Sequence, residues 1–82
     1  MKKIDIKIYS TDWCPSCDYA KRFLNEKDIL FEDINIEEKG WTRDKLFAIT
    51  GGRTVPQIVI NGKTIGGYED LLKLYSEEKL KI

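Results

Sequence analysis

The first part of the chain alternates charged and apolar residues and then changes to a helical spacing. Isoleucines recur at every second position within residues 3–9, which predicts a strand with one buried face. Apolar side chains follow at helical spacing over residues 15–27, and an apolar run at residues 29–34 predicts a second strand. A strand, a helix and a strand connected in this way predict a parallel unit with a right-handed crossover.

A second helix is expected at residues 42–50. Thr42 can cap its first turn and Gly51 can end it. Trp41 and Leu46 stand at the spacing of a hydrophobic staple, which fixes the direction in which a chain enters a helix.

Two strands joined by a hairpin and a final helix complete the pattern. The strands are expected at residues 57–60 and 63–66, and Asn61-Gly62 between them favours the two positive φ angles of a tight hairpin turn. Residues 68–78 predict an amphipathic helix. The resulting order, βαβαββα, is that of an α/β fold.

The charged positions of the first strand raise a question about the faces of the sheet. Lys3, Asp5 and Lys7 share one face, although helices on both sides of a central strand would bury that face. Two explanations are open. Either Lys7 lays its methylene stem along the core and keeps its amine in water, or the face is only partly covered.

Length and charge limit the class of protein. Eighty-two residues, 41% of them hydrophobic, predict one domain over residues 1–82 with a single core. The 14 Lys and Arg residues balance 14 Asp and Glu residues, so no broad electrostatic field favours nucleic acid or a membrane surface. Because the pattern contains neither a signal peptide nor a membrane-spanning stretch, we expect a cytoplasmic protein. We also expect a monomer.

The two cysteines, Cys14 and Cys17, stand in a Cys-x-x-Cys arrangement after the first predicted strand. This places Cys14 at the N-terminus of the first helix, where free N–H groups and the helix dipole stabilise a thiolate. Pro15 suits the first helical position. Cysteines at such sites have pKa values of roughly 3.5–7.5, compared with about 8.5 for a free cysteine. Cys17 lies one turn further on, close enough for a disulfide, and a redox-active pair is therefore favoured.

Three other interpretations of the pair remain. The cysteines could be ordinary core residues, or a purely structural disulfide, although so short a loop contributes little chain entropy. They could also be half of a zinc site. Structural zinc takes four ligands, usually Cys or His, and the chain has no histidine and no further cysteine, so two chains would have to share the metal. We therefore expect no metal.

Several landmarks occur in the order and spacing of one family: Cys14-Pro15-Ser16-Cys17, Gly52-Arg53-Thr54-Val55-Pro56-Gln57, Asn61-Gly62 and Ile65-Gly66-Gly67-Tyr68-Glu69-Asp70-Leu71. With them the chain resembles a dithiol glutaredoxin along essentially its whole length. The resemblance implies a thioredoxin-like fold, a four-stranded mixed sheet flanked by three helices, with a cis Pro56 whose backbone faces Cys14. It also implies a thiol–disulfide oxidoreductase in which Cys14 attacks the substrate and Cys17 resolves the mixed disulfide.

The resemblance further implies a binding site for glutathione, which serves as reductant and co-substrate. The residues concerned are Arg43, Thr54, Val55, Pro56, Gly67, Tyr68, Glu69 and Asp70. The backbone of Val55 would pair with the cysteinyl part of glutathione, and the helix N-terminus at residues 67–70 would take a carboxylate. Asp70 would hold the adjacent α-amino group, and Arg43 the glycyl carboxylate. Alternatively, Glu69 and Asp70 only complement the helix dipole, and Arg43 is a solvated charge.

The chain departs from the usual glutaredoxin pattern at three positions. Ser16 replaces a common Tyr, Thr11 replaces a common Lys, and Trp13 before the first cysteine is similar to thioredoxins. The main hypothesis is that glutathione reduces the protein and that its substrates are protein disulfides or glutathionylated proteins. One alternative is a redoxin of the same fold that thioredoxin reductase reduces. Another is a dimer that binds an iron–sulfur cluster through Cys14 and glutathione.

Overall fold

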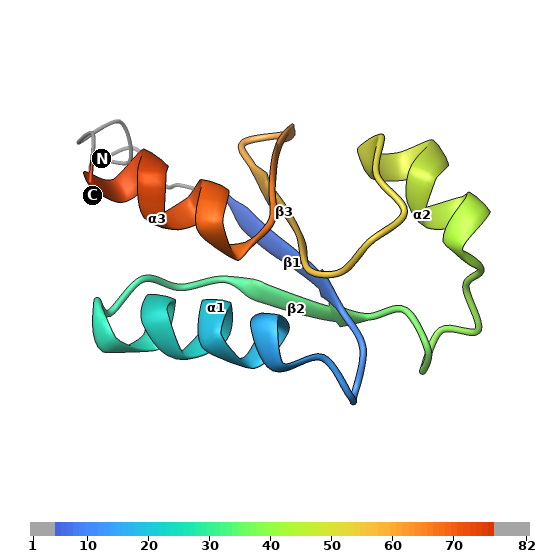
Figure 1. The fold of residues 1–82 in the computed structure, drawn as a ribbon, viewed down its shortest axis with the longest axis horizontal. Helices are drawn as coiled ribbons and strands as arrows, with labels where there is room; N and C mark the ends of the chain where they lie inside the picture. The colour runs from blue at the N-terminus through green and yellow to red at the C-terminus, as the bar shows by residue number, and fades with distance from the viewer. Residues whose placement is uncertain (1–4, 77–82) are drawn as a thin grey trace.

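The computed structural model describes residues 5–76, and its elements follow the expected βαβαββα order (Figure 1). They are β1 (Ile6–Ser10), α1 (Pro15–Glu26), β2 (Glu32–Asn35), α2 (Arg43–Thr50), β3 (Gln57–Ile60), β4 (Lys63–Gly66) and α3 (Tyr68–Ser76). The outer ends of the first predicted strand and of the last predicted helix lie outside the described residues. Within residues 5–76, no helix combines the length and the apolar character that crossing a membrane requires.

The four strands form one mixed sheet in the order β2-β1-β3-β4. β1 pairs in parallel with β2 and antiparallel with β3, and β3 pairs antiparallel with β4. The predicted parallel unit and the four-stranded mixed sheet with three helices are therefore confirmed. Because β1 lies inside the sheet, the loop that leaves it meets the end of β2 and the start of β3, and this loop leads to the cysteines.

Hydrophobic clusters on opposite faces of the sheet hold the helices in place. α1 and α3 cover one face, where Leu24, Ile58 and Leu71 are fully buried (Figure 1). α2 covers part of the other face. There Trp41 packs against the cluster that contains Leu46, as the staple spacing predicts. The core therefore anchors each of the three helices through a buried leucine.

The second cluster occupies only one end of its face, which answers the question raised by the charges of β1. Tyr9 belongs to the cluster, Lys7 is half-buried and Asp5 is exposed. The face is thus only partly covered, and its open end accommodates the charged side chains. Lys3 lies outside the described residues.

β2 begins at Glu32, so the predicted start of this strand at residue 29 is wrong. The reason is the end of α1, where Asp28 has a φ of 58° and turns the chain. The N–H of Ile29 donates to the carbonyl oxygen of Leu24 at 2.9 Å, and that of Asp28 donates to Asn25 at 3.1 Å. These two bonds form a Schellman motif. Ile29 is nevertheless buried, although its backbone belongs to the C-terminal cap of α1 and not to the sheet.

The predicted turn signals are confirmed. Thr42 Oγ1 accepts the N–H of Lys45 at 3.1 Å and caps α2, and Gly51 ends that helix with a φ of 85°. Asn61 and Gly62 have φ angles of 52° and 82° in the hairpin between β3 and β4. Each turn follows from a residue that tolerates or favours the required local geometry.

Candidate functional site

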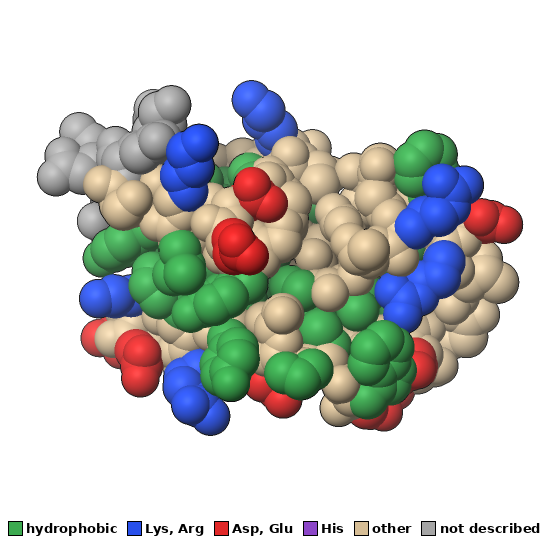
Figure 2. Space-filling model, viewed as in Figure 1, with side chains coloured by type: hydrophobic (Ala, Val, Ile, Leu, Met, Phe, Trp, Pro, Cys, Tyr) green, Lys and Arg blue, Asp and Glu red, His purple; other side chains and the backbone are tan. Residues whose placement is uncertain are grey.

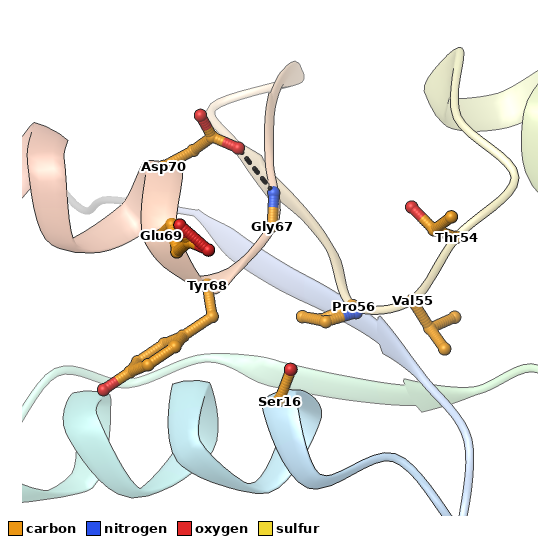
Figure 3. A pocket seen from close by; sticks show the side chains of 8 residues that line it. All are labelled: Ser16, Thr54, Val55, Pro56, Gly67, Tyr68, Glu69 and Asp70. Atoms are coloured by element: carbon orange, nitrogen blue, oxygen red, sulfur yellow. Dashed lines mark hydrogen bonds between the residues drawn. The ribbon is translucent and has the colours of Figure 1, made fainter.

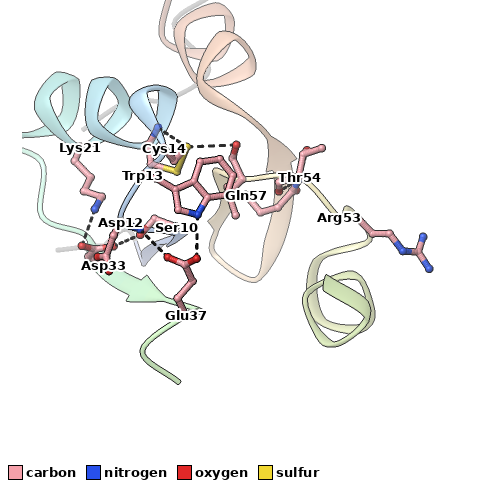
Figure 4. Close-up of a disulfide and its surroundings, with 12 residues drawn as sticks. Ser10, Asp12, Trp13, Cys14, Lys21, Asp33, Glu37, Arg53, Thr54 and Gln57 are labelled. Carbon is pink, nitrogen blue, oxygen red and sulfur yellow. Dashed lines mark hydrogen bonds and ion pairs between the residues drawn. A yellow bond between two sulfur atoms is a disulfide. The ribbon is translucent and has the colours of Figure 1, made fainter. Parts of the chain in front are cut away.

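Cys14 and Cys17 lie at the first turn of α1 and form a disulfide, with their Cα atoms 5.2 Å apart (Figure 4). Cys14 is the N-cap of α1 and Pro15 follows at the first helical position, as predicted. Cys14 Sγ accepts a hydrogen bond from the N–H of Cys17 at 3.1 Å. Cys14 retains 4% exposure, whereas Cys17 has none. Of the two cysteines, only Cys14 therefore retains any exposed surface in the disulfide form.

The first turn of α1 provides what a reactive thiolate needs. Once the disulfide is reduced, the N–H of Cys17 and the positive end of the helix dipole both stabilise negative charge on the Cys14 sulfur. The pair is bonded in the structure, so it is not a pair of free core cysteines. Among residues 5–76, no three His, Cys, Asp or Glu side chains lie together as potential metal ligands. The arrangement is suited to exchange between a dithiol and a disulfide.

The segment before β3 faces the disulfide. Val55–Pro56 is a cis peptide bond, and the carbonyl oxygen of Val55 lies 3.5 Å from Cys14 Sγ. The expected cis bond and its position opposite Cys14 are both confirmed. Gln57 holds this segment from the first residue of β3, because its Nε2–H donates to the carbonyl oxygen of Thr54 at 2.9 Å. The backbone of residues 54–56 is thus fixed beside the reactive sulfur.

An open cleft of about 440 Å³ lies between the start of α1, the segment before β3 and the start of α3 (Figure 3). Its lining consists of Ser16, Thr54, Val55, Pro56, Gly67, Tyr68, Glu69 and Asp70. Figure 3 shows Ser16 and Pro56 on opposite sides and the ring of Tyr68 pointing toward α1. Every residue that the resemblance assigns to glutathione lines this cleft except Arg43. The binding roles themselves stay predictions.

The start of α3 presents both backbone donors and carboxylates to the cleft. Asp70 Oδ2 accepts the N–H of Gly67 at 3.0 Å, so Asp70 caps its own helix (Figure 3). Gly66 leaves room for this carboxylate, because a Cβ there would collide with it. The negative charge of Asp70 repels a bare carboxylate at this helix end. A carboxylate with an adjacent ammonium group complements both the free N–H groups and Asp70.

Arg43 lies outside the cleft lining, at the start of α2. Its guanidinium carbon is 5.7 Å from the centre of the Trp13 ring, and its Nη1–H donates to the carbonyl oxygen of Arg53 at 3.1 Å. Arg43 is half-buried and links the segments on either side of the disulfide, so it is more than a solvated charge. The side chain of Arg53 is engaged elsewhere, 4.1 Å from the ring centre of Phe47 and 3.4 Å from the Asp44 carboxylate.

The surface around the disulfide is apolar between regions of opposite charge. Trp13 is 62% exposed and Tyr19 is 51% exposed, and the ring of Tyr19 lies 5.9 Å from that of Tyr68. Figure 2 shows a band of hydrophobic side chains over α1 and α3, acidic side chains near the start of α3 and basic side chains over α2. A ligand that lies across the disulfide therefore meets negative charge at one end and positive charge at the other.

Ser16 and Glu37 lie near the disulfide but were not among the predicted site residues. Ser16 lines the cleft, and its place between the cysteines was the available signal. Glu37 follows β2, and its Oε2 accepts a hydrogen bond from the indole Nε1–H of Trp13 at 2.9 Å. No local pattern marks Glu37, because only the parallel pairing of β1 with β2 brings it to the loop that carries Trp13.

The known proteins similar to this chain include many glutaredoxins. The Glutaredoxin family model matches residues 6–65. Glutaredoxin 3 of Escherichia coli (strain K12) is 36% identical over 70 residues, which cover 85% of this chain and 84% of that protein. Glutaredoxin-C8 of Oryza sativa subsp. japonica is 36% identical over 85 residues, covering 98% of this chain but only 62% of the rice protein. The crystal structure of a buckwheat glutaredoxin–glutathione complex matches with a TM-score of 0.80 at 25% identity, over 92% of this chain and 71% of that chain. The fold is therefore thioredoxin-like, as expected.

Proposed function

The chain belongs to the glutaredoxin family, and from that premise we propose that it is a thiol–disulfide oxidoreductase for protein disulfides and glutathione mixed disulfides. One observation carries the proposal: the Cys14–Cys17 disulfide lies at a helix N-terminus, where Cys14 Sγ accepts the N–H of Cys17 at 3.1 Å. Cys14 is the more exposed residue of the pair, and its sulfur lies beside the Val55 carbonyl group. Cys14 is accordingly the nucleophile and Cys17 the resolving thiol.

The proposed reaction consists of two exchanges. The Cys14 thiolate attacks one sulfur of the substrate disulfide, and the other substrate sulfur leaves as a thiolate and takes up a proton. Cys17 then loses its proton and attacks Cys14 Sγ, which releases the remaining substrate sulfur and forms the Cys14–Cys17 disulfide. The substrate gains two electrons in total. Rates depend on the thiolate fraction of the attacking sulfur and on the acidity of the leaving thiol.

Two molecules of glutathione would restore the dithiol. The first attacks Cys14 Sγ, forms a mixed disulfide with it and frees the Cys17 thiol. The second attacks the glutathione sulfur of that mixed disulfide, so glutathione disulfide leaves and Cys14 is a thiolate again. With a glutathionylated substrate, Cys14 alone suffices, because the glutathionyl group passes to Cys14 and is then removed by a second glutathione.

The cleft supports glutathione as the co-substrate. The backbone of Val55 offers the cysteinyl part an extended edge beside Cys14. The start of α3 offers N–H groups beside Asp70, which suits the adjoining carboxylate and ammonium groups of the γ-glutamyl residue. Arg43 remains the proposed cation for the glycyl carboxylate, at the opposite end of the apolar surface. The buckwheat glutaredoxin whose fold this chain shares was solved as a complex with glutathione.

A second electron source is favoured by one observation. Thr11 stands where many glutaredoxins are expected to have a cationic lysine, and it is only 2% exposed, so it offers glutathione no charge. A redoxin reduced by thioredoxin reductase is therefore the second candidate. The reduction rate of the Cys14–Cys17 disulfide by glutathione, compared with that by NADPH and thioredoxin reductase, decides between the two. A faster reaction with thioredoxin reductase would replace glutathione in the proposal.

Alkylation of the reduced protein tests the central claim. At about pH 6, far below the pKa of about 8.5 of a free cysteine, limiting iodoacetamide should label Cys14 well before Cys17. Peptide mass spectrometry measures the order of labelling. The Cys17→Ser variant should still remove glutathione from a glutathionylated peptide but lose the reduction of protein disulfides. Labelling of Cys17 first, or equal labelling of both, would overturn the assignment.

A further inference from the structure

Trp13 is an exposed aromatic side chain that is nevertheless held on two sides. It is 62% exposed and directly precedes Cys14. Its Nε1–H donates to Glu37 Oε2 at 2.9 Å (Figure 4). The guanidinium carbon of Arg43 lies 5.7 Å from the centre of the Trp13 ring. An exposed indole without such contacts would sample several rotamers. Here the ring has one defined place beside the disulfide.

Glu37 also holds the backbone from which Trp13 projects. Its Oε1 accepts the N–H of Asp12 at 3.2 Å, so one carboxylate bonds to two successive residues of the loop. Asn35, the last residue of β2, supports the same contact. Its Nδ2–H donates to the Asp12 carboxylate, and its Oδ1 accepts the N–H of Glu37 at 2.9 Å. The loop before the nucleophile is thus fixed by the segment that follows β2.

Trp13 does not belong to the cleft lining, so two different surfaces lie next to Cys14. One is the cleft, which suits a short peptide such as glutathione. The other is the indole face of Trp13. Trp13 directly precedes Cys14, and Val55 of the cleft lining brings its carbonyl oxygen to 3.5 Å from Cys14 Sγ. During exchange the substrate is covalently bound to Cys14 Sγ, and the chain of a protein substrate extends beyond a cleft of about 440 Å³. Because Trp13 is 62% exposed and directly precedes Cys14, its indole is available to the residues that flank the substrate cysteine.

We propose that Glu37 is a positioning residue, which holds Trp13 as a rigid docking surface for apolar side chains beside the cysteine of a polypeptide substrate. The inference rests on the proposed thiol–disulfide exchange and adds a substrate preference to it. A side chain that is already ordered loses little conformational freedom on binding. Trp and Arg are also the residues that most often dominate protein interfaces, and here Arg43 stacks beside Trp13. Loss of Glu37 should therefore weaken selection among polypeptides.

The test compares two disulfide-linked peptides that differ at one position, with Leu or Gly next to the cysteine. The measured quantity is the ratio of their kcat/KM values, determined for the wild type, Glu37→Ala, Glu37→Gln and the matched control Glu38→Ala. The wild type should prefer the Leu peptide, and Glu37→Ala should reduce this preference roughly two- to tenfold, as expected for one net hydrogen bond. Glu37→Gln keeps an acceptor for the indole and should restore most of the preference. Glu38→Ala removes the same charge one residue away and should behave as the wild type.

The indole N–H signal of Trp13 in a ¹H–¹⁵N spectrum provides a readout independent of activity. In Glu37→Ala this signal should move upfield and exchange faster with water, whereas the signal of Trp41 serves as an internal reference. Glu38→Ala should leave both signals in place. An unmoved Trp13 signal in Glu37→Ala, or an equal loss of peptide preference in Glu37→Ala and Glu38→Ala, would overturn the inference. A wild type that exchanges neither peptide would instead overturn the proposed function.

Discussion

Arg43→Ala is the change that most directly tests how the site recognises glutathione. Arg43 donates one N–H to the Arg53 carbonyl group, and its guanidinium group stacks on Trp13. Its remaining N–H groups are left to bind a ligand carboxylate. The substitution removes the proposed cation for the glycyl carboxylate but leaves the cleft lining and both cysteines unchanged. We therefore expect a higher KM for a glutathionylated peptide with little change in kcat, because this contact binds ground state and transition state alike.

The size of the effect follows from the environment of Arg43. A hydrogen bond to a charged group contributes about 1.5–3 kcal/mol, whereas a solvent-exposed ion pair contributes about 0.2–1 kcal/mol. Because Arg43 is half-buried against Trp13, the free energy that its contact contributes to binding should fall between these limits. A value of about 1–2 kcal/mol corresponds to a roughly fivefold to thirtyfold rise in KM. The effect should shrink at high salt, because the contact is partly open to solvent.

Arg53→Ala is the matched control, measured in the same steady-state assay at low and high salt. It removes an equal charge from a neighbouring residue whose guanidinium packs on Phe47 and pairs with Asp44. Its KM should stay within about twofold of the wild type, the size expected for a surface charge. A small neutral disulfide, with dithiothreitol as the reductant, should respond to neither variant. Equal rises in KM for Arg43→Ala and Arg53→Ala would show a general charge effect, and an unchanged KM for Arg43→Ala would remove Arg43 from the site.

Two further changes probe the start of α3. Asp70→Asn keeps an acceptor for the Gly67 N–H but loses the charge, so the thermal midpoint should hold while the KM for a glutathionylated peptide rises roughly three- to tenfold. Asp70→Ala should lower the thermal midpoint and also raise the KM, and equal melting of the two variants would contradict the separation of capping from charge. Gly66→Ala has to place a side chain at a φ of 115° against the Asp70 carboxylate. It should cost about 1–3 kcal/mol in urea unfolding, and an unchanged midpoint would refute the strain.

The elements that the sequence located well are those whose limits depend on local chemistry. Thr42 and Gly51 bound α2, and Asn61-Gly62 sets the turn between β3 and β4, because each acts on its own backbone. The start of β2 was misplaced because Asp28 adopts a positive φ. Aspartate tolerates this conformation, but its presence in a sequence does not predict it. Ile29 then reads as part of an apolar strand although its N–H closes the end of α1. Hydrophobicity reports burial, and it does not report which backbone bond a residue makes.

The site divides in the same way. The position of Cys14 at the N-terminus of α1 follows from the sequence, because the strand, the Cys-x-x-Cys motif and the helix are contiguous there. The cis Val55–Pro56 bond was predicted from the family resemblance. The contacts of Arg43 with Trp13 and of Trp13 with Glu37 could not be predicted from the sequence. They join segments that meet only after β1 and β2 have paired in register. Such contacts require the assembled sheet, and a search for local patterns has no access to them.

Hydrogen bonds from the two neighbours of β1 in the sheet, β2 and β3, fix the backbone on both sides of the disulfide. Asn35 and Glu37, at the end of β2, fix the loop that leads into Cys14, while Gln57, at the start of β3, fixes the backbone at Thr54. None of these hydrogen bonds includes a sulfur atom, so reduction breaks the bond between Cys14 and Cys17 without removing any of these contacts. We therefore expect the cleft and the loop that carries Trp13 to have the same structure in the dithiol and disulfide forms. Selectivity then arises from a surface that is already formed, and the direction of electron flow depends on the reduction potentials of the two partners.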